Sequence, residues 1–136
     1  MNNVMEYLKI ISEKTNIVFS EKGKKIRIRW NALSDARSQA VEIRAEKRYI
    51  ILTSTVVPGR LVNKKRLAKK ELLWTVLLKN KFSRIVNYSM NSKHDVEARI
   101  SLPENSLDFG EFEFYLSTLV HESDRFQRHL VKDELN

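Results

Sequence analysis

The chain has 136 residues, of which 42% are hydrophobic and 31% charged, and its net charge is +8. This length and composition predict one soluble folded domain over residues 1–136 and exclude a disordered chain. The absence of cysteine excludes disulfides, thiolate nucleophiles and thiolate metal sites. No run approaches the 18 or so apolar residues of a membrane helix, and the first residues lack a secretion signal. We therefore expect a cytoplasmic protein.

Positive charge is concentrated in the first 100 residues, which hold 22 Lys and Arg against 9 Asp and Glu. The last 36 residues hold 3 against 8 and are therefore acidic. Two interpretations follow. The basic part binds nucleic acid or another polyanion, or the acidic end of the chain packs near the basic part, in the same copy or in a second one.

The first half of the chain predicts one helix followed by strands. Residues 3–14 carry an apolar stripe at helical spacing. Alternating or β-branched runs then predict strands at 16–20, 24–30, 38–45 and 49–57. The second of these strands places Ile26, Ile28 and Trp30 on its buried face, with Lys25, Arg27 and Arg29 on its wet face.

The second half predicts a helix, two strands and a last helix. Asn63 can cap a helix that runs to about Asn80, after Pro58 and Gly59 have ended the sheet. Strands follow at 83–90 and 95–102. Asp108 can cap the last helix, with Glu111 three residues later as in a capping box. That helix carries apolar residues at helical spacing, namely Phe112, Tyr115, Leu116, Leu119, Phe126 and Leu130.

This order predicts an α+β fold, α-β-β-β(-β)-α-β-β-α, in which an antiparallel sheet has its helices on one face. In the core, we expect Trp74 and Leu78 to pack against the sheet on the same side as Trp30. The basic side chains of the early strands would then face water or a partner.

The stretch "NKKRLAKKELLWTVLLK" at 63–79 places five cations at the start of a predicted helix, where the helix dipole disfavours them. They are either a solvated lysine-rich face or an anion site that combines cations with free helix N–H groups. The candidate anion-binding residues are Lys64, Lys65, Arg66, Lys69 and Lys70, together with Lys25, Arg27 and Arg29 of the early strand.

The sequence lacks a recognisable catalytic or metal-binding motif, so we expect no enzyme activity, no metal and no cofactor. His94 falls in a predicted turn at 91–94, whereas His121 and His129 lie eight residues apart on the last helix, too far for a shared metal without further ligands. The spacing of Asp124 and Arg128 predicts a surface ion pair.

Several strings resemble the YbjN and type III secretion chaperone-like proteins. "DARSQAVEI" at 35–43 is similar to a hairpin segment of that family, and "LLWTVLLKN" at 72–80 resembles its second helix, with Leu77, Leu78 and Asn80 near the matching places. Residues 96–130 resemble its last strand and helix, with Ser123 and Asp124 at a paired position. The resemblance implies a small α+β domain that often forms homodimers and binds other polypeptides without being an enzyme.

The sequence is therefore compatible with two functions. The first is a chaperone-like or adaptor module that binds a polypeptide partner through an exposed sheet face or edge and a groove beside the helices. The alternative is a basic protein that binds nucleic acid or another polyanion. A homodimer is expected from the resemblance and from the charge asymmetry.

Overall fold

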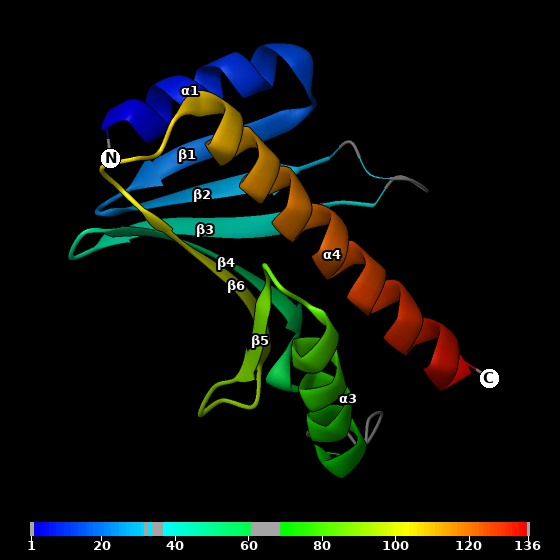
Figure 1. Ribbon diagram of the computed structural model, residues 1–136. Coiled ribbons are helices and arrows are strands. Elements are labelled where there is room, and N and C mark those ends of the chain that lie inside the picture. The colour runs from blue at the N-terminus through cyan, green and yellow to red at the C-terminus, as the bar shows by residue number, and fades with distance from the viewer. Residues whose placement is uncertain (1, 32, 34–36, 61–68, 136) are drawn as a thin grey trace.

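The computed structural model describes residues 2–31, 33, 37–60 and 69–135. The described elements follow the predicted order of a helix, four strands, a helix, two strands and a last helix (Figure 1). They are α1 (Asn2–Lys14), β1 (Ile17–Lys22), β2 (Lys25–Trp30), β3 (Gln39–Glu46), β4 (Tyr49–Val57), α3 (Lys69–Phe82), β5 (Asn87–Met90), β6 (Val96–Pro103) and α4 (Phe109–Leu135). The α+β prediction is thus confirmed.

The strands form one antiparallel sheet in the order β1-β2-β3-β4-β6-β5. Each of the first three strands pairs with the next strand along the chain. Strand β6 then pairs with β4, and β5 pairs with β6 at the edge of the sheet. The strand predicted at 83–90 begins only at Asn87. Residues 83–86 instead form the turn after α3. The Ser83 N–H donates to the Lys79 carbonyl at 2.8 Å, and the Ser83 hydroxyl accepts from the Val86 N–H at 3.1 Å.

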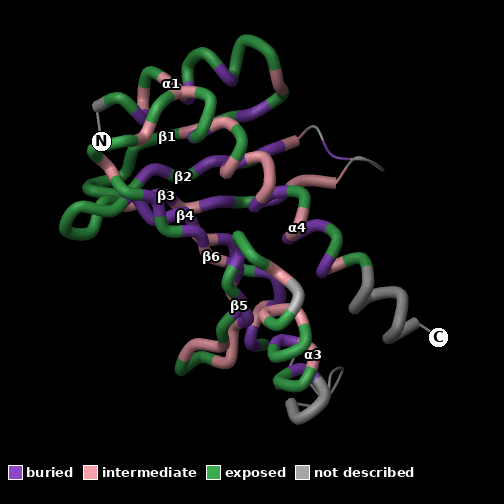
Figure 2. Tube along the Cα trace, viewed as in Figure 1, coloured by how far each residue is buried: buried purple, intermediate pink, exposed green. Residues whose placement is uncertain are grey.

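One face of the sheet forms the core, as the alternation in the sequence predicts. Ile26, Ile28 and Trp30 of β2 are buried while the residues between them are exposed. In β6 the alternate residues from Val96 to Leu102 are buried in the same way. Figure 2 shows these buried positions along the strands beneath α1 and α4. Within the described residues, the alternate positions of β2 point to the opposite face and are exposed, and this face is called the open face below.

Helix α4 covers the middle of the core face. Phe112, Leu116, Leu119 and Phe126 are almost completely buried, as predicted, and Tyr115 is half-buried; the side chain of Leu130 lies outside the described ones. The predicted cap is confirmed, because the Asp108 carboxylate accepts the Glu111 N–H at 2.8 Å. The charge of Asp108 raises the pKa of the Glu111 carboxyl, since the two acids lie together at the start of the helix.

A glycine and an aspartate join the end of β4 to the β5–β6 hairpin. A methyl group on Gly59 would lie 2.0 Å from the Lys93 carbonyl oxygen, so a side chain does not fit there. The Gly59 N–H donates to the Asp95 carboxylate at 2.6 Å, and the Asn91 side-chain amide donates to the same carboxylate at 3.1 Å. These hydrogen bonds favour the charged form and lower the pKa of Asp95.

Candidate functional site

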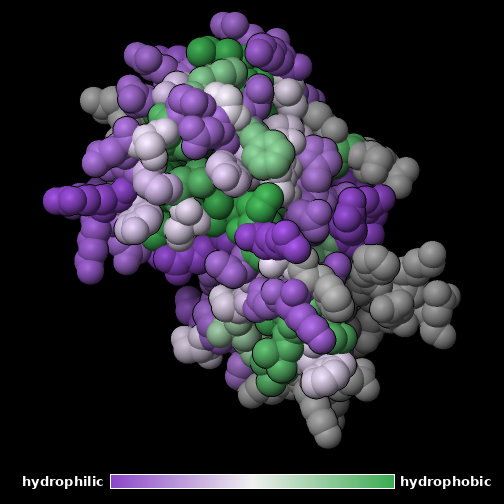
Figure 3. Space-filling model, viewed as in Figure 1, coloured by the Kyte–Doolittle hydropathy of each residue, from purple (hydrophilic) through white to green (hydrophobic). Residues whose placement is uncertain are grey.

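Helix α3 presents a face of large apolar side chains to solvent. Trp74 and Leu77 are each 62% exposed, and Leu73 and Leu78 are each 40% exposed. The prediction that Trp74 and Leu78 pack against the sheet is therefore wrong. Figure 3 shows hydrophobic side chains gathered over the α3 region in the lower part of the view.

The sequence of α3 explains the error. Six of the seven residues from 72 to 78 are apolar, so the periodicity does not select one face of the helix. The structure uses Leu72 and Val76, which are buried, and turns the wider row of apolar side chains outward. A helix that is apolar on nearly all sides needs a second partner besides the sheet. The excess of apolar residues in α3 was therefore the sequence signal for an exposed binding surface.

Asn80 fixes the orientation of α3 against the edge strand β5. Its side-chain amide donates to the Tyr88 carbonyl at 2.7 Å and its side-chain oxygen accepts the Tyr88 N–H at 2.7 Å. These are backbone groups of an edge strand, so Asn80 blocks strand addition at that point. Burial, followed by the charge of Glu122, raises the pKa of Tyr88 to about 12, and its ring stacks on Phe126 at 5.1 Å.

The opposite edge of the sheet differs from β5. Strand β1 pairs only with β2 among the described strands. Val18, the second residue of β1, is 62% exposed. An edge of this kind can accept an extended segment of another chain by β-strand addition.

A groove of about 580 Å³ runs between α1 and α4 on the core side of the sheet. Ile11 of α1 and Thr15, the residue after α1, line one side of it, and Trp30 lines it from the end of β2. The α4 wall includes Phe114, which is 55% exposed, and His121. The rings of Trp30 and His121 meet edge to face with their centroids 6.1 Å apart.

The predicted anion-binding residues fall into two groups. Lys64, Lys65 and Arg66 lie outside the described residues, and only the backbone of Lys69 and Lys70, the first residues of α3, is described. Lys25, Arg27 and Arg29 lie together on the open face of the sheet, as predicted. Lys25 pairs with Glu42 at 3.4 Å and Arg29 donates to Ser38 at 3.0 Å.

Arg27 and Arg29 also line a hollow of about 450 Å³ on this open face. Its lining includes small side chains, among them Ser20 and Ala40, and the carboxylate of Glu42. The mixture of charges makes this hollow less basic than the sequence of β2 alone indicates.

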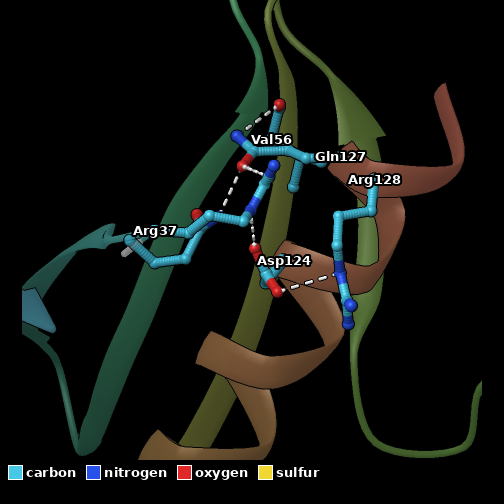
Figure 4. A network of polar contacts seen from close by, with 6 residues as sticks. Arg37, Val56, Asp124, Gln127 and Arg128 are labelled. Atoms are coloured by element: carbon cyan, nitrogen blue, oxygen red, sulfur yellow. Dashed lines mark hydrogen bonds and ion pairs between the residues drawn. The ribbon is translucent and has the colours of Figure 1, made fainter. Parts of the chain in front are cut away.

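A buried ionic network joins α4 to the start of β3, and local spacing in the sequence predicts only its Asp124–Arg128 pair (Figure 4). Asp124 is only 2% exposed and accepts from Arg37 at 2.5 Å and from Arg128 at 3.1 Å. Gln127 accepts from the buried Gln39 and donates to the Val56 carbonyl at 2.9 Å. The predicted pairing of Asp124 with Arg128 is confirmed, but it is not a surface pair.

The described residues give no sign of a metal centre or a membrane span. No group of three or more His, Asp and Glu side chains in them could hold a metal ion. His94 adopts a positive φ of 65° in the β5–β6 turn, far along the chain from His121, and the side chain of His129 is not described. Within the same residues, no helix is both long enough and apolar enough to cross a bilayer.

Neither a protein-family model nor a curated protein matches this sequence. The arrangement of strands and helices does match solved structures. One is the Yersinia pestis type III secretion chaperone SycH in complex with a stable fragment of YscM2, with a TM-score of 0.59 and 12% identity over 90% of this chain and 94% of that chain. The chain has the fold of the type III secretion chaperones. The HopA1–SchA chaperone-effector complex gives a TM-score of 0.57 and 12% identity over 82% of this chain and 80% of the matched one.

Proposed function

We propose that this protein is a non-enzymatic, chaperone-like adaptor that binds a polypeptide partner. The observation that carries the proposal is the apolar surface that the fold leaves uncovered on α3 and beside the α1–α4 groove. Contiguous exposed apolar surface on a small domain marks an interaction site. The fold adds support, because the two matched structures are a chaperone with a YscM2 fragment and a chaperone-effector complex.

The proposed adaptor is a homodimer in which α3 of one copy packs against α3 of a second copy. A two-fold axis brings the same face of both copies together, and the row formed by Trp74 and Leu77 can then pack against itself. The resemblance to chaperones that often pair supports this arrangement. It leaves the α1–α4 groove free for the polypeptide, since none of the residues lining that groove comes from α3.

Sedimentation tests the dimer. The wild type should sediment as a dimer at micromolar concentration, and Trp74→Ser combined with Leu77→Ser should sediment as a 16.0 kDa monomer. Ile10→Ser combined with Val18→Ser removes two exposed apolar side chains away from α3 and should leave the dimer intact. A wild type that is monomeric throughout contradicts the dimer.

Purification of the tagged chain from its native host tests the polypeptide partner. We expect a stoichiometric polypeptide by mass spectrometry and an absorbance ratio free of nucleic acid. Nucleic acid bound without a polypeptide would instead favour the alternative function, polyanion binding by Lys25, Arg27 and Arg29 and by the cations at 64–70. Until that measurement, the anion site stays a prediction.

A further inference from the structure

The α1–α4 groove follows one face of α4 that is separate from the core face. Its lining residues on α4 recur at spacings of three and four, from Gly110 through Ser117 and Thr118 to Glu122. The twelve helical steps from Gly110 to Glu122 span about 18 Å, so the groove extends along roughly three turns. Small residues, namely Gly110, Ser117 and Thr118, leave space between the helices, while Phe114 and Ile11 supply apolar contact.

The charge of the groove is opposite to that of the chain. Its lining includes the carboxylates of Glu113 and Glu122 and no Lys or Arg, although the whole protein carries a net charge of +8. Glu122 pairs with Arg125 at 3.5 Å across one turn of the helix. Glu113 has no ion-pair partner within the described part of the chain, which leaves a carboxylate available to a cation.

Trp30 adds an unused hydrogen-bond donor to this lining. Its side chain is 94% buried, and the indole Nε1 has no hydrogen-bond partner. Buried indole N–H groups normally find an acceptor, and leaving one unpaired costs free energy. A backbone carbonyl brought by a bound segment would supply that acceptor after a small shift of the groove wall.

We propose that the α1–α4 groove binds a segment of the partner polypeptide in which apolar side chains are flanked by Lys or Arg. This inference rests on the proposed function and specifies the chemistry of the partner. The apolar side chains pack on Phe114 and Ile11, and a basic side chain pairs with Glu113 or Glu122. Repulsion between like charges disfavours acidic segments in the same groove.

A displayed library of random 12-residue peptides, selected against the full chain, provides the probe. Enriched peptides should combine apolar residues with Lys or Arg. Their affinity should fall about tenfold for the variant Glu113→Gln/Glu122→Gln, and it should weaken as salt rises. The control Glu6→Gln/Glu21→Gln makes the same charge change at exposed sites outside the groove lining and should bind like the wild type.

The two indole N–H signals in a nitrogen-15 correlation spectrum locate the bound peptide. Trp74→Phe assigns them, because the chain contains only Trp30 and Trp74. The Trp30 signal should shift on peptide binding and the Trp74 signal should not. Trp30→Phe, which keeps an aromatic ring and removes the donor, should weaken binding by a few fold.

Several results would overturn the inference. Enriched peptides that bind without a preference for Lys or Arg, or whose affinity is unchanged in Glu113→Gln/Glu122→Gln, would reject the basic segment and leave the adaptor proposal standing. A shift of the Trp74 signal alone would move the peptide to α3. A change in the sedimentation of the peptide-free variant would make the groove a contact between copies. Failure to enrich any peptide would reject the groove as a peptide site, while the adaptor proposal would still be decided by the purification from the native host.

Discussion

Helices α3 and α4 are both rich in apolar residues, but they meet the sheet in different ways. Helix α4 crosses β3, β4 and β6 and buries Phe112, Leu116 and Leu119 there (Figure 1). Helix α3 rests on the short edge strand β5 and buries one row, leaving Trp74 and Leu77 outside. The difference shows that burial depends on how much sheet lies beneath a helix as well as on the number of apolar residues in the helix.

The same difference separates stability from binding. An apolar side chain in α4 already gains its hydrophobic free energy in the folded chain, at about 25 cal/mol per Å² buried. An exposed side chain in α3 gains little on folding and keeps most of that free energy for association. Substitutions in the two helices should therefore affect different measurements.

The largest expected effect is that of Phe112→Ala in α4. Phe112 has no exposed surface, and its ring lies 5.8 Å from that of Tyr7. Its truncation removes apolar contact and leaves a cavity, which should lower the free energy of unfolding by about 3–5 kcal/mol. Urea unfolding followed by circular dichroism measures this loss.

Trp74→Ala in α3 is the matched control. A larger side chain is removed here, but from an exposed position, so the free energy of unfolding of the monomer should change by less than about 1 kcal/mol. Measurements in the background Leu77→Ser, at a concentration at which sedimentation shows a monomer, keep dimer dissociation out of the comparison. If the two truncations cost the same, the contrast between the helices is wrong.

Much of the fold could be predicted from the sequence because its strands alternate cleanly. In β2, apolar residues alternate with Arg27 and Arg29, and this alternation is sufficient to predict which face of the strand is buried. The apolar residues are Ile26, Ile28 and Trp30. The Asp108 cap has a local signature, and so does the apolar row of α4. These features depend on residues a few positions apart, which is the range over which periodicity and capping act.

The candidate site could be predicted only in part, since it depends on contacts between distant segments. From local spacing, Asp124 is predicted to be a surface residue. The fold buries it by placing Arg37, 87 positions away in the chain, in contact with it. The groove needs α1 and Trp30 beside α4, and the outward face of α3 depends on the bond between Asn80 and Tyr88. In these cases tertiary contacts decide what local spacing leaves open.

A second prediction concerns the polar anchor of α4. Asp124→Asn removes the charge that Arg37 and Arg128 share, and should lower the free energy of unfolding by about 1–3 kcal/mol. Both arginine side chains are partly exposed, at 30% and 50%, so water replaces some of the lost interaction.

Single changes of the two arginines sharpen this prediction. Arg37→Gln should cost more than Arg128→Gln, since the shorter contact and the less exposed side chain belong to Arg37. Thermal unfolding of the three variants gives the order directly. An equal loss for both arginines would mean that Asp124 acts mainly through its own helix.

The smallest expected effect concerns the base on which α3 rests, the β5–β6 hairpin tied to Gly59 by Asp95. Hydrogen bonds from the Gly59 N–H and from Asn91 lower the pKa of Asp95 below its ordinary value of 3.8. The contribution of the charged carboxylate to stability is therefore complete at neutral pH, begins to decline as the pH approaches 3.8, and is lost once the pH passes below the folded-state pKa.

Asp95→Asn should be less stable than the wild type at pH 7, and the difference in the free energy of unfolding should shrink towards pH 3. Hydrogen exchange should show this first in β5 and α3, because α3 packs on β5. Helix α4 should lose less protection, because it also packs on β3 and β4. A difference that stays constant from pH 7 to pH 3 would show that Asp95 contributes through its shape and not through its charge.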